Sequence, residues 1–452
     1  MTWTKTKTAA AAGAAVILAI GATRVVLKEV HSPKAIHLAA GVFPQTLAEL
    51  NAWYVEPLDG QNAATINLRG IKARQIGGAD QNADLPVLGK GSLPAPGTPL
   101  PAPLKSALAA FQERNRAALR FFSQGTACDQ SRYPIDLSKG FETLLPHLAG
   151  IKSGMQITEM SAVLDAENGQ GKSAADDVLM TLSLARSLKG EPVLISQLVR
   201  VAGVAIAADG LNQVVNRTTL PPESLGELSK AFQSMEDYDV RGEGFNRAIM
   251  GENIIHQALL ENRKELIRLF VAGATGRPDA QSRRLLEYLK KDGDLKPEQR
   301  YLETTYQQVL SARQAAFPGR LKEVADLIRQ RTAEATDQGL LLSAILLSGT
   351  DVHVMREARC LANLRLALTA VALEQFRAAH DNRYPAALSE LTPTYLDATL
   401  MDPFDGQPLR YRKQGAGYVL YSIGPDLKDN SGERMGAKGG DLVFTVVAPP
   451  TP

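Results

Sequence analysis

The chain of 452 residues is poor in the residue types that announce a function most directly. It holds two cysteines and six histidines, and its 50 Lys and Arg residues nearly match its 48 Asp and Glu residues. Two cysteines cannot form a disulfide framework, so stability has to come from a buried core. Because nucleic-acid-binding proteins concentrate positive charge, a net charge of +2 also argues against nucleic acid as a partner.

The few histidines and cysteines form no evident catalytic or metal-binding set. No two histidines stand at the spacing of metal ligands, and His147 lies only loosely downstream of Cys128. We expect both cysteines to be unpaired, with Cys360 buried as a small apolar residue. A disulfide between Cys128 and Cys360 is the alternative that the sequence leaves open, because an exported protein could form one.

Residues 166–173 (AENGQGKS) satisfy a relaxed phosphate-binding loop pattern. A true loop of this kind follows a buried strand and cradles phosphate with backbone N–H groups. Here the preceding residues have the pattern of a helix, and Ala166 stands at the first glycine position. We therefore interpret the stretch as a polar turn between helices, with Ser173 as N-cap of the second helix and Asp176 and Asp177 in its first turn.

Aromatic residues are also sparse, at 6%, while runs of Ala, Leu, Glu, Gln and Arg dominate and favour helices. Over residues 104–350 the apolar residues recur at helical spacing. We predict a helical body there, an irregular bundle or array, because short connectors make consecutive helices antiparallel neighbours. Residues 31–103 are irregular and end in a Pro- and Gly-rich strap, which either lies on the body or acts as a linker.

The segment after Pro192 is the predicted centre of the helical body. One of its apolar stripes consists of Leu194, Leu198, Val201, Val204, Ala208, Leu211 and Val215. Each fully buried Leu or Val contributes roughly 1.5 to 3 kcal/mol. A charge at Val204 should therefore unfold the domain.

Residues 1–30 have the composition of a membrane anchor or signal segment. Lys5 and Lys7 precede an apolar run over residues 8–23, which reaches the roughly 20 residues of a spanning helix only if residues 25–27 are included. We expect an uncleaved anchor, with a cleaved signal peptide as the alternative. The positive flank stays in the cytoplasm. The predicted location is the inner membrane, with one span and the body facing the periplasm, or the periplasm itself after cleavage.

Residues 351–452 have the pattern of an α+β domain. The stretch from Leu361, LANLRLALTAVALEQFRAAH, is apolar on more than one face and predicts a buried helix. After DNRYPAALSELTP and the turn-rich MDPFDGQP, two runs with period-2 patterning around Tyr411 and from Gly417 flank KQGAG, which is a hairpin signal. A third run, DLVFTVV, completes a small antiparallel sheet against the helix. The predicted fold class is mainly α with a C-terminal α+β domain.

The order of helix, DNRYP, DPFDGQPLRY and GYVLYSIGPD resembles the globular part of the major pseudopilin of type II secretion. The resemblance implies a long helix on a small sheet that ends in a calcium-bearing loop. Pseudopilins assemble through a Phe-Thr-Leu start and a Glu in the membrane helix, which the start of this chain does not match, and Phe404 stands where the family usually has Trp. We expect a shared fold without polymerisation.

The helical body is similar to that of a group of uncharacterised exported bacterial proteins that carry the same C-terminal module. The segments that carry this likeness include SRYPIDLSKGFETLLPHL and ADDVLMTLSLARSLKGEPVLISQLVRVAGVAI. It implies the joint architecture and no known activity.

The loop SIGPDLKDNSGERM is the candidate metal site. It gathers the oxygen ligands that a hard cation such as calcium requires, from Ser422, Asp426, Asp429, Asn430, Ser431 and Glu433. In pseudopilins the corresponding loop binds calcium, and Ser422 and Asp426 match that motif, whereas Lys428 intrudes. The prediction is calcium held by Ser422, Asp426 and Asp429. The alternative is a turn-rich polar loop without metal.

These features predict a non-enzymatic cell-envelope protein, in which a membrane-anchored helical scaffold presents a pseudopilin-like domain for protein contact. The expected partners are envelope proteins, including secretion or pilus-like machinery, and the membrane itself through the N-terminus. Two other functions stay open. One is an exported hydrolase whose catalytic acids meet only in the fold. The other is an envelope-sensing regulatory module, for which the tail MTWTKTKT is short.

Overall fold

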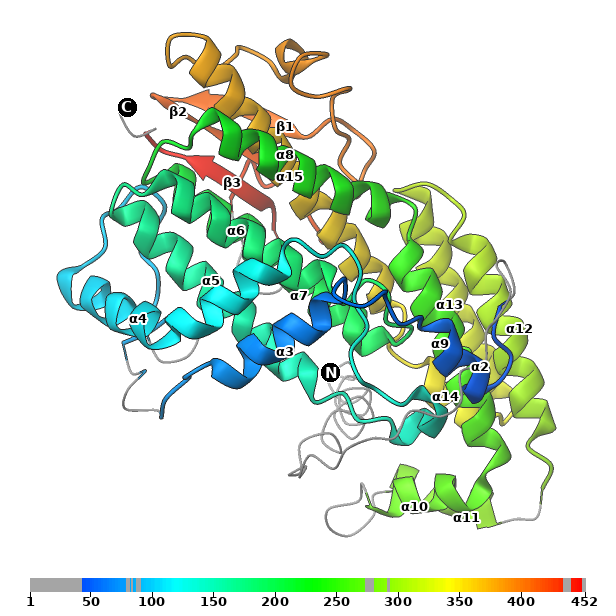
Figure 1. The fold of residues 1–452 in the computed structure, drawn as a ribbon. Coiled ribbons are helices and arrows are strands. Elements are labelled where there is room, and N and C mark those ends of the chain that lie inside the picture. Colours follow the sequence, from blue (N-terminus) through cyan, green and yellow to red (C-terminus); the bar gives the residue numbers. More distant parts are fainter. Residues whose placement is uncertain are drawn as a thin grey trace.

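The computed structural model describes residues 43–78, 82, 84–86, 91–272, 280–290, 293–433 and 440–448 (Figure 1). The predicted anchor or signal segment, residues 1–30, lies outside the described residues. Within the described ranges the protein is mainly helical, with one three-stranded antiparallel sheet near the C-terminus. The predicted fold class is confirmed at that level.

The helices of the described ranges are α2 (Leu47–Trp53), α3 (Ala63–Ala73), α4 (Ala102–Gly125), α5 (His147–Glu167), α6 (Gly171–Arg186), α7 (Leu194–Val215), α8 (Pro222–Val240), α9 (Glu243–Glu261), α10 (Arg263–Ala272), α11 (Ala280–Lys290), α12 (Lys296–Ala312), α13 (Gly319–Asp337), α14 (Leu341–Leu347) and α15 (Val352–Ala379). Two short 3₁₀ helices are η3 (Leu137–Glu142) and η4 (Leu388–Leu391). The strands are β1 (Arg410–Gln414), β2 (Gly417–Ser422) and β3 (Leu442–Val446).

Helix α7 lies at the centre of the described structure, as the sequence predicts. It contacts α5, α6, α9, α15 and strand β3 (Figure 1). Val204 in its middle is fully buried. Gly251 of α9 comes so close that a Cβ there would stand 1.9 Å from the carbonyl oxygen of Pro192, two residues before α7 begins. A bulky or charged side chain in this region has no room.

The predicted apolar stripe of α7 is only half correct. Val204, Ala208, Leu211 and Val215 are buried, but Leu194, Leu198 and Val201 are partly exposed. At that end of the helix the buried positions belong to Ser196, Gln197 and Arg200. The reason is electrostatic, since the buried Arg200 meets Asp239 of α8 with an Nη2–Oδ1 distance of 2.5 Å.

The AENGQGKS stretch is a turn between two helices, as interpreted from the sequence. Helix α5 ends at Glu167, Gly169 adopts φ 73°, and α6 begins at Gly171. The predicted cap is wrong, however, because Gln170 is the N-cap residue and Ser173 already lies inside α6. Asp177 is consequently buried in the helix rather than solvated in its first turn.

The Pro- and Gly-rich strap lies on the body. Leu100 is buried in a cluster with Leu104, Leu108 and Phe111 of α4 and with side chains of α5. The backbone N–H of Leu100 also donates to Glu167 at 3.1 Å. Because both apolar and polar contacts hold it, this part of the chain is a packed element and not a linker.

The two cysteines are free, and Cys360 is buried in α15 as expected. Helix α15 itself starts at Val352, earlier than the predicted Leu361. The hairpin prediction is confirmed. Strands β1 and β2 pair in register with Tyr411 opposite Leu420, and Gly415 takes φ 59° in the tight turn between them.

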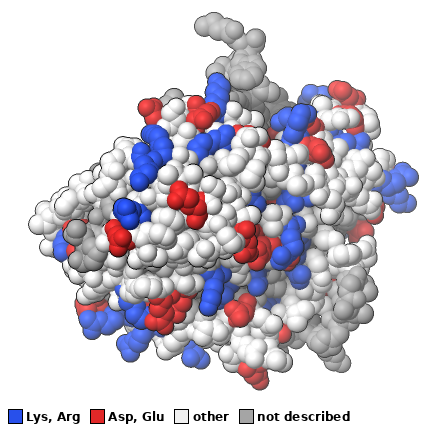
Figure 2. Space-filling view, turned by 90° about the horizontal axis from the view of Figure 1, so that it is seen from above, with Lys and Arg blue, Asp and Glu red and all other residues white. Residues whose placement is uncertain are grey.

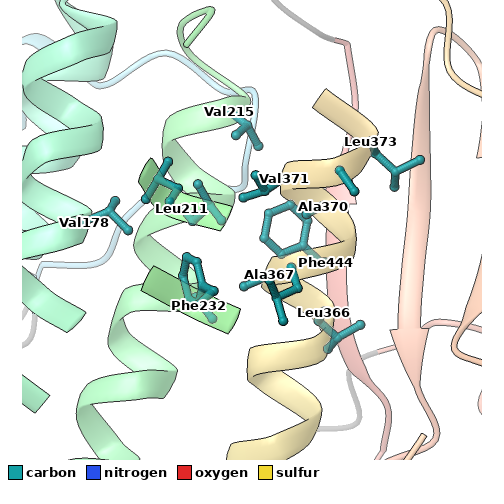
Figure 3. Packing of buried hydrophobic residues seen from close by; sticks show 14 of the residues in the cluster. Val178, Leu211, Val215, Phe232, Leu366, Ala367, Ala370, Val371, Leu373 and Phe444 are labelled. Carbon is teal, nitrogen blue, oxygen red and sulfur yellow. The ribbon is translucent and has the colours of Figure 1, made fainter. Parts of the chain in front are cut away.

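Helix α15 is buried on two sides. The sheet, in the order β1-β2-β3, covers one side, and α7 and α8 cover the other (Figure 1). Figure 3 shows the shared core, where Leu211 of α7, Phe232 of α8, Val371 of α15 and Phe444 of β3 belong to a single hydrophobic cluster. The C-terminal module is therefore continuous with the helical body.

Candidate functional site

Two carboxylates organise the acidic loop after β2. The Oδ2 atom of Asp426 accepts hydrogen bonds from the backbone N–H of Gly440 at 3.0 Å and from Asn430 Nδ2 at 3.3 Å. Asp441 accepts from the backbone N–H groups of Asn430 and Gly432, at 3.2 and 2.6 Å. Both ends of the loop are thus tied together by carboxylate-to-backbone bonds.

The other two predicted ligands face different partners. The Asp429 carboxylate accepts from the hydroxyl of Tyr421 at 3.2 Å and from the backbone N–H of Ser431 at 2.8 Å. The buried Ser422 hydroxyl donates to Asp402 at 2.9 Å. The described structure therefore brings Asp426 together with Asn430 and Asp441, but not with Ser422 or Asp429.

The oxygen atoms that the loop offers as metal ligands suit calcium only in part. Among the described residues, no three or more His, Cys, Asp or Glu side chains are arranged to hold a metal ion. Residues 434–439 of the loop lie outside the description. Partial burial opposes ionisation of Asp426, but hydrogen bonds led by the Lys428 N–H keep its pKa below the usual value, so the carboxylate is ionised at neutral pH. Calcium would be held by Asp426, Asp441 and Asn430 and would supply positive charge that crosslinks the loop.

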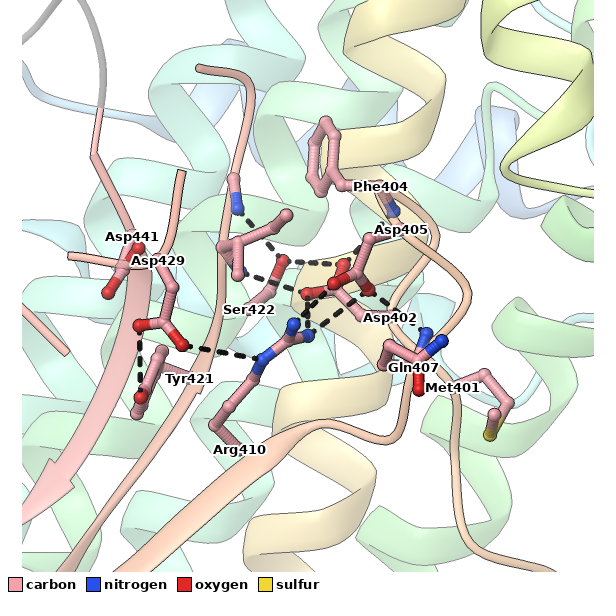
Figure 4. A network of polar contacts seen from close by, with 12 residues as sticks. Met401, Asp402, Phe404, Asp405, Gln407, Arg410, Tyr421, Ser422, Asp429 and Asp441 are labelled. Atoms are coloured by element: carbon pink, nitrogen blue, oxygen red, sulfur yellow. Dashed lines mark hydrogen bonds and ion pairs between the residues drawn. The ribbon is translucent and has the colours of Figure 1, made fainter. Parts of the chain in front are cut away.

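Asp402 is the residue around which the neighbouring turn is built, and sequence reasoning missed it (Figure 4). It is fully buried. One of its oxygens accepts from the N–H of Phe404 at 3.0 Å as well as from Ser422, and the other accepts from the N–H of Ile423 at 2.9 Å and from Arg410 at 3.0 Å. Burial raises its pKa although these donors oppose the shift. The DPFDG pattern is the signal that could have found it.

A groove of about 560 Å³ lies between α9 and α12, where the described chain begins at Phe43. Its wall includes the ring of Tyr306, while amide and charged side chains such as Gln257 and Arg300 form much of the rest. Beneath it, the hydroxyl of Tyr306 lies 2.7 Å from Nδ1 of His256, and Nε2 of His256 lies 3.7 Å from Glu252. Glu252 in turn accepts from the backbone N–H of Leu194 at 3.0 Å.

This chain of polar groups positions the groove wall but offers no free base. Burial lowers the pKa of His256 to about 4, so the ring is neutral at pH 7. Each ring nitrogen faces a protein group, which leaves none to take a proton from a ligand. A hydrolase would need such a base within reach of the groove, and these residues do not provide it.

A second buried cluster contains a serine, a carboxylate and a histidine in an order that does not activate the serine. The hydroxyl of Ser196 donates to Glu191 at 2.5 Å, and His147 lies 2.8 Å from the other Glu191 oxygen. In a catalytic triad the histidine stands between the serine and the acid. Here the acid stands between them, and Tyr133 is stacked over His147 at 4.3 Å. The cluster packs α7 against α5.

Basic and acidic side chains are interspersed over the face of the molecule in Figure 2. No extended field of one sign covers that face. Comparison with known proteins yields no match to a family model, to a curated protein or to a solved structure. The likeness to pseudopilins and to exported bacterial proteins therefore rests on the motifs of the sequence alone.

Proposed function

We propose that the protein is a non-enzymatic component of the cell envelope, in which a helical scaffold anchored by its N-terminus presents a pseudopilin-like module for protein contact. One observation carries the proposal. A long helix, α15, packs on a three-stranded antiparallel sheet whose strands β2 and β3 are joined by the acidic loop, and the resemblance implies a long helix on such a small sheet with an acidic loop. The calcium loop and the secretion or pilus-like partners belong to the same proposal.

The placement of α15 favours a fixed module over a polymerising one. Its first turns are buried within the body, where Val354, Ala358 and Leu361 have almost no exposed surface. A filament subunit needs its long helix free to pack against neighbouring copies. In this chain, the helical body already covers that surface.

The exposed loops of the module are the proposed contact surface. Met401 is 41% exposed beside the Asp402 network (Figure 4), and Leu427 is 54% exposed in the acidic loop. Methionine is among the residues enriched at protein interfaces relative to the rest of the surface. The network around Asp402 holds the backbone that presents Met401.

Fractionation of cells that make the full chain tests the envelope assignment. We expect the protein in the membrane fraction after alkaline washing, with the body digested by protease added from the periplasmic side. Recovery only in the cytosol would contradict the proposal. A cleaved signal would instead leave a soluble periplasmic protein, shorter at its N-terminus by mass spectrometry.

Site-specific crosslinking tests the contact surface. A photoreactive residue in place of Leu427 should give one or a few discrete products in the native envelope. The same residue in place of Leu58, which is 73% exposed between α2 and α3, is the matched control and should give none of them. Identical products from both positions would contradict the proposal that the module is the contact surface.

A further inference from the structure

The groove between α9 and α12 lies along two antiparallel helices that contact each other (Figure 1). At one end, Asn246 of α9 accepts a hydrogen bond from Arg313, which directly follows α12. At the other end, Gln257 of α9 donates to the backbone carbonyl of Gln299 at 3.0 Å. The α9 side of the groove extends over residues 250–261. With a rise of about 1.5 Å per residue, the groove is about 16 Å long.

The end of the groove near the C-terminus of α12 is apolar. Phe43, Met250 and Leu310 line it. The Phe43 side chain is 54% exposed, and its ring meets the Trp53 ring edge-on at 6.3 Å. Arg247 of α9 lies 3.7 Å from the centre of the Trp53 ring, which places Phe43 at this end. An apolar side chain of a ligand would be removed from water here.

The opposite end, where α12 begins, is basic. Lys296 and Arg300 line the groove there and are exposed. Within the described ranges, neither of them forms an ion pair. Glu261 is the acid at the same end of α9, so two positive charges face one negative charge. This end therefore favours a carboxylate, which an Arg guanidinium can bind through two parallel hydrogen bonds.

Between the two ends, α12 presents a row of polar side chains that matches the repeat of an extended peptide. Gln299, Glu303 and Gln307 follow one another in steps of four residues, about 6 Å along the helix. An extended chain repeats every two residues, at about 6.6 Å. None of the three side chains is hydrogen-bonded within the part of the chain that the structure describes. Each Gln can bond a peptide C=O or N–H, and Glu303 can accept from an N–H.

The remaining wall of the groove is fixed by hydrogen bonds within the protein. The hydroxyl of Tyr306 lies 2.7 Å from Nδ1 of His256. The amide of Gln257 donates both to Asn253 and to the Gln299 carbonyl. Side chains that are already ordered lose little conformational freedom when a ligand binds. The groove is therefore built for binding, although it offers no base for catalysis.

We propose that the groove binds the extended C-terminal tail of a partner polypeptide, with an apolar side chain at the Phe43 end and the terminal carboxylate at Lys296 and Arg300. About five extended residues span 16 Å. A fatty acid would share the apolar part and the carboxylate, but it has no backbone groups for the row of polar side chains on α12. The site lies on the helical body, so it adds to the proposed contact surface of the module and does not rest on the envelope assignment.

Three fluorescent peptides test the inference on the full chain. The first is Leu-Ile-Ser-Thr-Ser with a free C-terminal carboxylate, the second ends in a carboxamide, and the third has the free carboxylate but N-methylated backbone amides at its central residues. Fluorescence anisotropy should show at least tenfold tighter binding of the first peptide than of the second. N-methylation should weaken binding about fivefold for each hydrogen bond lost. The advantage of the carboxylate should shrink from about 50 mM to about 500 mM salt, because salt screens exposed charges.

Variants at the two ends of the groove separate their contributions. Lys296→Gln with Arg300→Gln should abolish the preference for the carboxylate and leave binding of the carboxamide unchanged. Phe43→Ser should weaken binding of both peptides. Lys230→Gln with Arg412→Gln removes the same charge from exposed positions on α8 and β1, and this matched control should change neither affinity. Circular dichroism and urea midpoints verify that each variant is folded.

Four outcomes would overturn the proposal. No peptide binds, or the carboxylate and carboxamide peptides bind equally well. Dodecanoate displaces the first peptide while N-methylation has no effect, which would make the groove a site for acyl chains. The protein forms a dimer that Phe43→Ser dissolves in sedimentation velocity, which would make a second copy the occupant. A photoreactive residue in place of Gln307 crosslinks to residues before Phe43 of the same chain, which would mean that the chain covers its own groove.

Discussion

The helical body and the C-terminal module each contain a centre of buried charge, and the two centres are built differently. In the body, Arg200 pairs with Asp239, and Arg313 and Arg320 both bond Glu357, which lies in the first turns of α15 that the body encloses, at 2.8 to 3.1 Å. In the module, a fully buried Asp402 meets Arg410, whose side chain is 21% exposed. The first centre is closed to water and the second reaches the surface.

The two charge centres differ in exposure because they hold different parts of the structure in place. The body centre joins α7, α8 and α15 to the segments around α12 and α13, and it is packed so tightly that a Cβ on Gly242 would stand 2.9 to 3.1 Å from Arg320, Arg313 and Glu357. The module centre bonds two backbone N–H groups and one hydroxyl of nearby turns. One centre therefore fixes the packing of helices, whereas the other fixes the path of surface loops.

Replacement of Asp239 by Ala should have the largest effect, because it leaves the buried Arg200 without a counter-charge and with only its hydrogen bond to Gln197. Breaking one side of a buried ion pair costs about 3–5 kcal/mol. Urea unfolding followed by circular dichroism would measure the loss. Asp237→Ala, an exposed acid of the same helix, should change stability by less than about 0.5 kcal/mol. A loss below about 1 kcal/mol for Asp239→Ala would mean that the body does not depend on this centre.

Replacement of Asp402 by Asn should cost less and act locally. The NH2 group of Asn is a donor, and it would face Arg410 or the N–H groups that donate to the Asp402 carboxylate. Hydrogen bonds worth about 1.5–3 kcal/mol are therefore lost. Hydrogen exchange should quicken at residues 402–410 and 422–433, while α5 and α7 stay protected. Asp405→Asn, which disturbs the partly exposed side of Arg410 and one bond from the Gln407 N–H but leaves Asp402 in place, is the control. Equal loss of protection across α7 would show that the two centres are not separable.

Calcium should stabilise the module by a smaller amount. If the loop binds with a Kd of about 1 mM, as extracellular modules do, about 10 mM calcium adds about 1.4 kcal/mol. The rise in melting temperature should disappear in Asp426→Ala and persist in Asp397→Ala, an exposed acid outside the loop. Titration calorimetry without heat, together with an unchanged melting temperature, would leave only a polar loop.

The features predicted correctly from the sequence depend on neighbouring residues. The hairpin around Gly415 and the turn at Gly169 follow from local backbone preferences, and burial of α15 follows from its apolar composition on several faces. Helical periodicity also places α7 at the centre. In each case, the deciding residues lie within one or two turns of chain.

The features that were missed depend on partners distant in the chain. Helix α7 is apolar on nearly every side, so periodicity cannot decide which face turns inward, and the pairing of Arg200 with Asp239 decides it. Ser422 matches a metal-loop motif, but its hydroxyl donates to Asp402, twenty residues earlier in the chain. Asp441 escaped notice because it lies beyond the predicted loop. Tertiary contacts decide which helix face is buried and which partner a polar side chain takes, and the spacing of residues along the chain does not reveal them.

The pH dependence of stability gives the smallest expected effect. It tests the body alone, because the group that titrates is Glu159 of α5. Its folded pKa of about 8 exceeds the unfolded value of 4.5, so its contribution is complete below about pH 4.5 and is lost as pH rises through 8. His256 and His353, with pKa values lowered to about 4, stay neutral in the folded protein above pH 6.5.

Unfolding midpoints from pH 6.5 to 9 should therefore fall more in the wild type than in Glu159→Gln. The difference should stay below about 1 kcal/mol because solvent screens a partly exposed carboxylate. Parallel curves for the two proteins would mean that Glu159 is already ionised at pH 6.5 in the folded protein, and that neither burial nor the neighbouring charge of Asp209 sets its titration.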